Sequence, residues 1–268
     1  MILIIVLIIT VLFVLSTIGR TGHALLPELR KWSYAHRGLY GNGVPENSLT
    51  AFRLAKEAGY GIELDVHLLQ DGNLAVMHDS KLMRTTGCDG RLEDLTSGQL
   101  ENYRLEQTDE RIPLFSQVLD LIHGEIPLIV ELKVSQGVDI HVLCTNVCKL
   151  LDEYEGLYCL ESFDPRCIRW LRNNRPEILR GQLTENYFIS KTSSLPWFLK
   201  FVLKHQMLNF LTMPDFIAYR YTDRQTVSNI ICRRLWKLQG VSWTIKNREE
   251  YDTAVAENWI PIFEGFLP

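Results

Sequence analysis

The stretch Gly61-Ile62-Glu63-Leu64-Asp65-Val66 decides the fold, because it places two carboxylates at alternate positions of an otherwise apolar run. Alternate residues of a β-strand point to the same side, so Glu63 and Asp65 share one face of the predicted strand. The run Val130-Glu131-Leu132-Lys133 ends in the same way. Strands with aliphatic residues on one face and ionisable residues on the other suit a parallel barrel whose axis receives the ionisable groups.

Apolar runs of this kind alternate with amphipathic helical segments along the rest of the chain. That alternation predicts an α/β protein, with a parallel sheet covered by helices. Eight strands can be placed, which favours a TIM (β/α)8 barrel. The predicted strands are residues 32–37, 61–66, 128–133, 157–162, 179–183, 216–219, 240–245 and 259–264.

One apolar run, residues 73–77, breaks the alternation because it follows Val66 after only six residues. A parallel crossover needs a dozen residues or more, so this run is predicted to fold back as a hairpin across Asp71-Gly72. The hairpin returns His78 to the mouth of the second strand. Residues 80–111 are rich in charges and turn formers and are predicted to form a small insertion above the barrel.

The N-terminus carries an excess of aliphatic side chains, since residues 2–18 are apolar apart from Thr10, Ser16 and Thr17. A helix over these residues covers about 26 Å, close to a hydrocarbon core of about 30 Å, and this predicts one transmembrane helix that holds the protein at the membrane. A cleavable signal peptide and a buried helix are the alternatives. We therefore expect an anchor at residues 1–20, a juxtamembrane segment at 21–31 and a barrel domain at 32–268.

Charge and cysteine usage bear on compartment and partners. Arg20, Arg30 and Lys31 all follow the apolar segment, which favours a single-pass protein of the cell membrane with a cytoplasmic barrel. The six cysteines lack metal-finger spacing and favour the same side of the membrane. A net charge of −4 without a basic block argues against nucleic acid as a partner. The sequence leaves the oligomeric state open.

Three carboxylates, those of Glu63, Asp65 and Glu131, are expected at the carboxyl ends of neighbouring strands. Burying like charges side by side is costly unless a cation pairs with them. Hard oxygen ligands suit Mg²⁺ or Ca²⁺, and this predicts a site for one divalent cation. For any one of these carboxylates alone, exposure to solvent at a strand end is the alternative.

Two histidines are expected at the same mouth, His36 at the end of the first strand and His78 at the end of the hairpin. Histidine titrates near neutrality, so a pair can supply one general base and one general acid. Arg37 offers a bidentate donor fork suited to a phosphoryl oxygen. Metal, arginine and two histidines together predict phosphodiester cleavage of a small molecule.

The order and spacing of these motifs resemble the glycerophosphodiester phosphodiesterase family. The resemblance covers nearly all of the chain after the apolar N-terminus. It rests on Ala35-His36-Arg37-Gly38, Pro45-Glu46-Asn47-Ser48, Ile62-Glu63-Leu64-Asp65-Val66, Asp71-Gly72, His78-Asp79, Arg84-Thr85-Thr86-Gly87, Ile112-Pro113-Leu114, Glu131-Leu132-Lys133, Ser162-Phe163-Asp164 and Val241-Ser242-Trp243-Thr244.

The resemblance implies a TIM barrel that hydrolyses glycerophosphodiesters, the deacylated phospholipids, to glycerol 3-phosphate and an alcohol with a divalent cation. The first histidine of the family is pictured as acting on the glycerol hydroxyl, which attacks phosphorus to give a cyclic phosphate that water opens. Residue by residue, the resemblance implies these roles: metal ligands Glu63, Asp65 and Glu131; acid and base His36 and His78; phosphate-binding groups Arg37 and Lys133; site-lining aromatics Phe163 and Trp243; and a metal-shell or positioning role for Glu46.

Two departures from the family pattern stand out. Ser48 replaces a common Thr, and the last strand ends in Glu264 where the family has Thr-Asp followed by Pro, which leaves the role of Glu264 open.

The apolar and basic stretch at residues 195–205 fits either an interfacial helix or an outer barrel helix.

Two other functions stay open beside the main prediction. The first is a phospholipase D-like activity on lysophospholipids or related membrane phosphodiesters. The second is a binding module without catalysis, which five ionisable groups at one mouth disfavour.

Overall fold

Eight parallel strands close into a barrel in the computed structural model, which describes residues 1–190 and 194–268. Strand β1 pairs with both β2 and β9, and this double pairing closes the sheet on itself. The predicted TIM barrel is therefore confirmed. The barrel strands are β1 (Tyr34–His36), β2 (Gly61–Leu68), β4 (Leu128–Leu132), β5 (Tyr158–Ser162), β6 (Arg180–Thr184), β7 (Phe216–Arg220), β8 (Gln239–Ile245) and β9 (Trp259–Phe263).

Strand β3 (Leu74–Val76) runs antiparallel to the end of β2, as the six-residue spacing predicts. The insertion that follows contains short helical turns, α4 (Met83–Thr86), η1 (Leu92–Asp94) and η2 (Ser97–Asn102). Its leucines bury a small core of their own beside β3, together with Met77 and Ile112. This local core holds the hairpin end, and with it His78, in place beside the barrel mouth.

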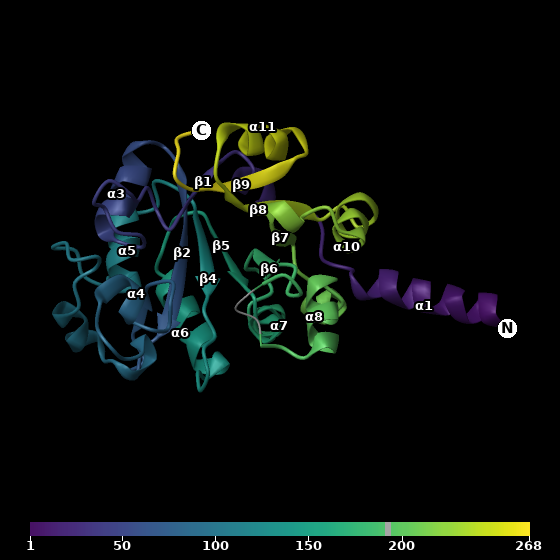
Figure 1. Ribbon diagram of the computed structural model, residues 1–268, viewed down its shortest axis with the longest axis horizontal. Coiled ribbons are helices and arrows are strands. Elements are labelled where there is room, and N and C mark those ends of the chain that lie inside the picture. Colours follow the sequence, from purple (N-terminus) through teal and green to yellow (C-terminus); the bar gives the residue numbers. More distant parts are fainter. Residues whose placement is uncertain (191–193) are drawn as a thin grey trace.

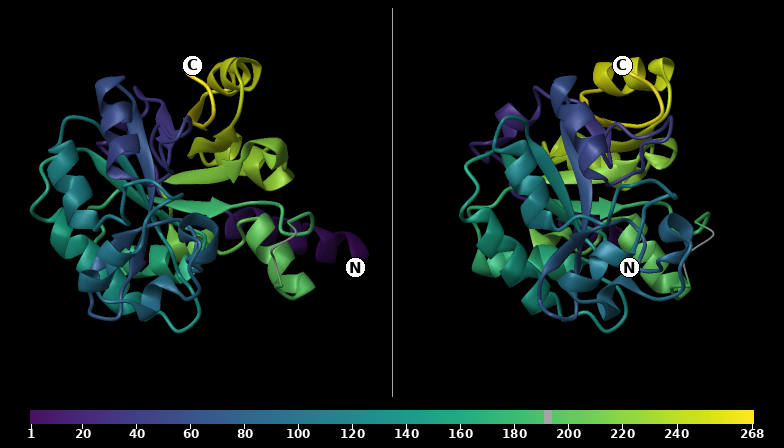
Figure 2. Two further views of the ribbon diagram at one scale, coloured as in Figure 1. Left: turned by 60° about the vertical axis from the view of Figure 1, so that its left-hand side comes forward. Right: turned by 90° about the vertical axis from the view of Figure 1, so that its left-hand side faces the viewer.

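Helices surround the strands (Figures 1 and 2). Several begin at a side-chain cap: Ser48 accepts from the amide of Ala51, and Asp164 accepts from the amide of Arg166. The helical elements are α2 (Leu26–Leu29), α3 (Leu49–Glu57), α5 (Phe115–Ile122), α6 (Ile140–Leu151), α7 (Pro165–Asn174), α8 (Trp197–Lys204), α9 (Asn209–Thr212), η3 (Tyr221–Asp223), α10 (Val227–Ile230), η4 (Ile231–Leu235) and α11 (Arg248–Ala256).

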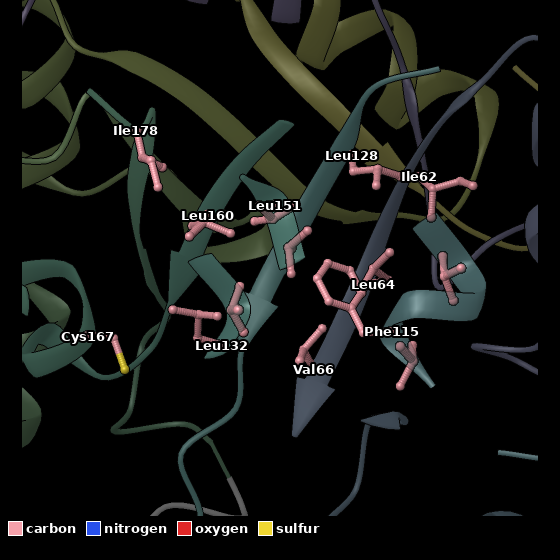
Figure 3. Close-up of a cluster of buried hydrophobic side chains, with 14 of the residues drawn as sticks. Ile62, Leu64, Val66, Phe115, Leu128, Leu132, Leu151, Leu160, Cys167 and Ile178 are labelled. Carbon is pink, nitrogen blue, oxygen red and sulfur yellow. The ribbon is translucent and has the colours of Figure 1, made fainter. Parts of the chain in front are cut away.

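The main hydrophobic core lies between the outer face of the barrel and these helices. Figure 3 shows Ile62, Leu64 and Val66 of β2 on that side, close to Phe115 of α5. All four side chains are fully buried. Because these residues alternate with Glu63 and Asp65, the packing of Ile62, Leu64 and Val66 against the helices turns both carboxylates into the barrel.

The barrel interior has two layers. Toward the amino ends of the strands the inward side chains are apolar, and Tyr34, Ile129, Cys159, Phe216 and Ile260 belong to one buried cluster. Two residues further along the strands, the inward side chains of β1, β2, β4 and β5 become ionisable, whereas Leu183, Ala218 and Ile262 of β6, β7 and β9 still belong to the apolar cluster. The ionisable groups therefore lie at the barrel mouth, and the packed apolar cluster lies beneath them.

The predicted membrane anchor is wrong. Helix α1 covers only Ile2–Ser16, about 22 Å, and in the described part of the chain none of the helices is long and apolar enough to cross a membrane. The helix ends because Thr17 is buried against the barrel, where its hydroxyl accepts from Trp236 Nε1 at 3.1 Å. The prediction of a single-pass protein of the cell membrane with a cytoplasmic barrel depended on this anchor and is wrong with it. Helix α1 itself projects from the barrel (Figure 1 and the left view of Figure 2).

Candidate active site

A cavity of about 260 Å³ opens at the carboxyl ends of the barrel strands. It joins groups up to 228 positions apart in the chain, since His36 of β1 lies beside Glu264, the residue after β9. Most of the predicted site residues border it. The lining residues are His36, Arg37, Tyr40, Glu63, His78, Glu131, Glu161, Phe163, Leu183, Trp243, Thr244, Ile262 and Glu264.

The three predicted metal ligands meet beside this cavity, which Glu63 and Glu131 line and Asp65 does not. One carboxylate oxygen each from Glu63, Asp65 and Glu131 lies within 4.8 Å of the others. All three side chains are buried, with 6% or less of each residue exposed. The parallel register between β2 and β4, in which Asp65 is opposite Glu131, produces this arrangement. The predicted grouping of the three carboxylates is therefore observed.

The charges around this group differ from one carboxylate to the next. Burial and the neighbouring charge of Asp65 raise the pKa of Glu63 well above its usual value. Burial also raises the pKa of Asp65, but Lys133, with His78, Arg37 and Asn47, outweighs it and holds that pKa well below normal. Asp65 is thus the ionised member of the group. Glu63 is the carboxyl whose ionisation a further cation would favour most.

Arg37 lies above these carboxylates and is held from two sides. Its Nη1 donates to both oxygens of Glu46 at 3.0 and 3.1 Å, and its Nε lies 3.4 Å from Asp65 Oδ2. Glu46 also pairs with Arg84 of the insertion. Glu46, for which the resemblance implied a metal-shell or positioning role, therefore contacts the guanidinium of Arg37.

Lys133, the first residue after β4, bridges the carboxylates. Its Nζ lies 3.2 Å from Asp65 Oδ1 and 3.1 Å from Glu131 Oε1. Burial would lower the pKa of this amine, but Asp65 and Glu131 outweigh it and raise that pKa. Lys133 therefore stays charged between Asp65 and Glu131, although it is not among the residues that line the cavity.

His36 is oriented by Glu264. Its Nδ1 lies 2.6 Å from Glu264 Oε2, and because a carboxylate can only accept, Nδ1 carries the hydrogen and Nε2 is the nitrogen left free to take a proton. Glu264 is held in turn by the hydroxyl of Tyr40 at 2.8 Å and by Lys246 Nζ at 2.9 Å. Burial lowers the pKa of His36, and the bond to Glu264 offsets part of this effect.

His78 has a similar partner in the next residue. Its Nδ1 lies 2.6 Å from Asp79 Oδ1, and Asp79 pairs with Arg84. Burial lowers the pKa of His78, while the charge of Asp65 acts in the opposite direction. Both predicted histidines are thus fixed by carboxylates at Nδ1, and both border the same cavity.

The two predicted aromatic residues form one wall. The rings of Phe163 and Trp243 meet edge to face with centroids 5.6 Å apart, and the guanidinium of Arg220 lies over Trp243 at 5.3 Å. The family resemblance implied that both residues line the site, and both border the cavity.

Glu161 of β5 is a site residue that the sequence prediction missed. Its side chain lines the cavity, only 1% of the residue is exposed, and its Oε2 has no hydrogen-bond partner. It pairs in register with Glu131 across β4 and β5. Its alternation with Cys159 in the predicted strand 157–162 is the signal that could have identified it as inward-facing.

The donor set fits a divalent cation. Four carboxylates are buried here, those of Glu63, Asp65, Glu131 and Glu161, and among the described residues Arg37 and Lys133 are the permanently charged side chains that contact Asp65. Such an excess of buried negative charge is unfavourable without a further cation. Oxygen donors of this kind suit Mg²⁺ or Ca²⁺, and a single ion could contact the three grouped carboxylates.

Relatives of this chain carry related names. A glycerophosphodiester phosphodiesterase of Caldanaerobacter subterraneus subsp. tengcongensis is 33% identical over 56% of this chain and 65% of its own length. One of Bacillus altitudinis is 38% identical over 39% of this chain and 45% of its own length. The chain thus spans less than two thirds of the length of these two relatives. Glycerophosphodiester phosphodiesterase 1 of Mus musculus is 29% identical over 90% of this chain and 80% of its own.

Solved structures share the fold. A phosphodiesterase of Oleispira antarctica, solved with the product sn-glycerol-3-phosphate, superposes with a TM-score of 0.70 at 23% identity and covers 91% of this chain and 95% of its own. A glycerophosphodiester phosphodiesterase of Thermotoga maritima gives a TM-score of 0.64 at 23% identity, over 87% of this chain and 93% of its own.

The glycerophosphoryl diester phosphodiesterase family matches residues 36–256, a range that runs from His36 to the end of α11 and includes every predicted metal, histidine, phosphate-binding and aromatic position. The chain belongs to that family.

Proposed function

We propose that this protein is a phosphoric diester hydrolase that converts glycerophosphodiesters to glycerol 3-phosphate and an alcohol, with Mg²⁺ or Ca²⁺ held by Glu63, Asp65 and Glu131. One observation carries the proposal: two histidines, each held at Nδ1 by a carboxylate, border one cavity whose floor is a buried group of carboxylates. The names of the relatives support the same reaction.

His36 is the general base of the proposed reaction. The hydrogen on Nδ1 is committed to Glu264, so Nε2 takes the proton of the glycerol hydroxyl that attacks phosphorus. The carboxylate of Glu264 then faces the imidazolium that forms and stabilises it. His78, fixed by Asp79, donates a proton to the oxygen of the departing alcohol, which leaves a cyclic phosphate. Water then opens this ring, adding its hydroxyl to phosphorus and its proton to the released glycerol oxygen, and glycerol 3-phosphate results.

The phosphate is held by fixed positive charge. The Arg37 guanidinium, aligned by Glu46, and the Lys133 amine, aligned by Asp65 and Glu131, face the anionic oxygens. A bound divalent cation supplies further charge neutralisation at the phosphoryl oxygens. Phe163 and Trp243 exclude water from the side of the cavity that they line.

Release of glycerol 3-phosphate from glycerophosphocholine and glycerophosphoethanolamine tests this proposal. The full chain is dialysed against EDTA and then given Mg²⁺, Ca²⁺ or Mn²⁺ in separate assays. We expect turnover that EDTA abolishes and a divalent cation restores. A folded protein that releases no glycerol 3-phosphate under any of these conditions would overturn the proposal and favour a binding module instead.

A further inference from the structure

One buried histidine takes no part in the proposed mechanism. His67 lies on β2 at the alternate position after Glu63 and Asp65, so it belongs to the same face of the strand. Only 1% of the residue is exposed. A buried imidazole needs a partner for each polar ring atom, and the two partners of His67 indicate what it does.

Both ring nitrogens of His67 contact acceptors. Nδ1 lies 2.9 Å from Glu93 Oε1, and Nε2 lies 3.3 Å from the main-chain oxygen of His78. A carboxylate and a carbonyl oxygen can only accept, so both nitrogens donate. The ring of His67 therefore bridges the insertion, which supplies Glu93 from η1, and the segment that carries the second histidine of the site.

The main chain at His78 depends on this bridge. Strand β3 ends at Val76, so the carbonyl of His78 lies beyond the ladder and accepts from a side chain instead. Glu93 also holds the chain on the other side of His78, since Ser80 Oγ donates to Glu93 Oε2 at 2.6 Å. Residues 78–80 are thus tied to one carboxylate at two points, once through the imidazole and once through the hydroxyl.

Glu93 stays ionised in its buried position. Burial would raise the pKa of this carboxyl, but hydrogen bonds from His67, Ser135 and Ser80 outweigh burial and lower the pKa to about 2. A buried ion pair adds little to stability compared with apolar side chains of similar volume, and the insertion already has an apolar core of its own. The pair is therefore better explained by the groups that it holds in place than by stability.

We propose that His67 and Glu93 position His78, so that the insertion sets the place of the proton donor in the proposed reaction. This inference rests on the proposed function and deepens it. Both are positioning residues, since they contact the main chain at His78 and the hydroxyl of Ser80 and move no proton to the substrate themselves. A displacement of about 1 Å at a reacting group can lower a rate by about 10²-fold, so loss of the bridge should slow the step that needs the proton donor.

Two substrates separate the positioning of a proton donor from general damage. The choline of glycerophosphocholine must take a proton as it leaves, whereas the nitrophenolate of glycerophospho-p-nitrophenol leaves as an anion. Release of each alcohol is followed in single turnovers, with the protein in excess and the cation that supports turnover present. Loss of the fold or of the cation would slow both releases, whereas a misplaced donor would slow the release of choline alone.

His67→Asn is the main variant, because its shorter amide can still donate to Glu93 but does not reach the carbonyl of His78. It is expected to slow choline release by about 10²-fold and nitrophenolate release by about threefold or less. His78→Ala supplies the reference pattern, with a larger loss for choline and a similarly small one for nitrophenolate.

Three further variants localise the effect. His67→Gln is longer and keeps a donor near the position of Nε2, so it should lose about tenfold or less in choline release. Glu93→Gln removes the charge that orients the imidazole and should slow choline release selectively, by about tenfold. Glu101→Gln, an exposed residue on η2 of the same insertion, is the matched control and should change neither release. Circular dichroism melting checks that each variant folds.

The outcomes separate the two proposals. If the wild-type protein releases both alcohols but His67→Asn slows both equally or neither, the positioning role is overturned while the proposed function stands. Equal losses in His67→Asn and His67→Gln also overturn it, because the donor to His78 would then be irrelevant. If His67→Asn does not fold, Glu93→Gln carries the same test, and equal slowing of both releases or of neither overturns the inference.

The reference variant and the wild-type protein test the assumption beneath the inference. If His78→Ala slows both releases equally, His78 is not the proton donor, and the inference is overturned together with that step of the mechanism. If the wild-type protein releases neither alcohol with any cation, the proposed function fails, and the inference fails with it.

Discussion

The two layers of the barrel interior stand on the same strands and have opposite chemistry. On β4, Ile129 belongs to the apolar layer and Glu131, two residues on, to the ionisable one. On β5, Cys159 and Glu161 repeat the pattern. Both layers are buried, so burial alone does not separate the part that stabilises the fold from the part expected to carry the chemistry.

The difference lies in what each layer needs from its surroundings. The lower layer gains free energy by leaving water and fills its space with its own atoms. The ionisable side chains of the upper layer lose their hydration when they are buried. Only a charged or hydrogen-bonding partner compensates for that loss, as Lys133 does for Asp65. Substitutions in the lower layer should therefore change stability, and those in the upper layer should change activity and ion binding.

The largest expected effect is on activity in the upper layer. His36→Ala and His78→Ala should each lower kcat on glycerophosphocholine by roughly 10³- to 10⁴-fold, because each removes one partner of the proton transfers. The melting temperature should stay close to the wild-type value. His141→Ala, an exposed histidine of α6, is the control and should leave kcat unchanged. Near wild-type turnover in either site variant would remove that histidine from the proposed mechanism.

The converse effect is expected in the lower layer. Ile129→Ala should lower the free energy of unfolding by about 2–5 kcal/mol, since it leaves a cavity in a fully buried cluster. Urea unfolding measures this loss, and kcat of the folded variant should stay within a few-fold of wild type. Val142→Ala on the exposed face of α6 is the matched truncation and should cost about 0.5 kcal/mol or less. A variant that keeps its stability but loses turnover would contradict the separation of the layers.

Glu264 tests whether the upper layer acts through oriented pairs. Glu264→Gln keeps the shape but removes the charge that faces His36, so kcat should fall by about 10²-fold. Because Glu264 raises the pKa of His36, its loss should move the acidic limb of the kcat/KM profile to lower pH. Lys246→Ala removes an exposed partner of Glu264. It should lower kcat by no more than a few-fold and leave the acidic limb of the kcat/KM profile in place. An unmoved pH profile in Glu264→Gln would show that Glu264 has only a structural role.

Much of this comparison was predictable from the alternation of residues. The pattern in Gly61-Ile62-Glu63-Leu64-Asp65-Val66 predicted both the strand and its inward carboxylates, because a strand has a side-chain period of two. The eight barrel strands and the hairpin followed from similar local patterns. What local pattern could not supply is the contact between distant ends, such as the 2.6 Å pair of His36 and Glu264, which depends on how β1 and β9 close the barrel.

The same limit explains the N-terminal error. Hydropathy predicted a span over residues 2–18, but the helix ends at Ser16 because Thr17 packs against Trp236 and Cys232, 215 or more residues away in the chain. Glu161 was missed for a different reason. It lies just before the Ser162-Phe163-Asp164 motif that resembles the family, so only its alternation with Cys159 marks it as inward-facing.

Glu161 gives the smallest predicted effects and the sharpest test of the upper layer. Burial and the charge of Glu131 raise the pKa of Glu161 well above its usual value, so the folded protein takes up a proton that the unfolded chain releases above about pH 4.5. Without metal, this carboxyl therefore destabilises the fold progressively as pH rises above the unfolded pKa. Glu161→Gln should raise the melting temperature of the metal-free protein by a few degrees at pH 7 and change it little at pH 4.

The same substitution should weaken ion binding. A carboxylate beside Glu131 adds negative charge toward the ion, and its loss should raise the Kd for Ca²⁺ or Mg²⁺ by about 10- to 100-fold in isothermal titration. Glu153→Gln on the exposed surface is the matched control and should alter neither quantity. A variant that becomes more stable without metal and binds metal less tightly would show that this carboxylate serves the ion at the expense of the fold. If Glu161→Gln instead destabilises the metal-free protein at pH 7, Glu161 belongs with the packed lower layer, and the boundary between the layers lies one strand position higher on β5.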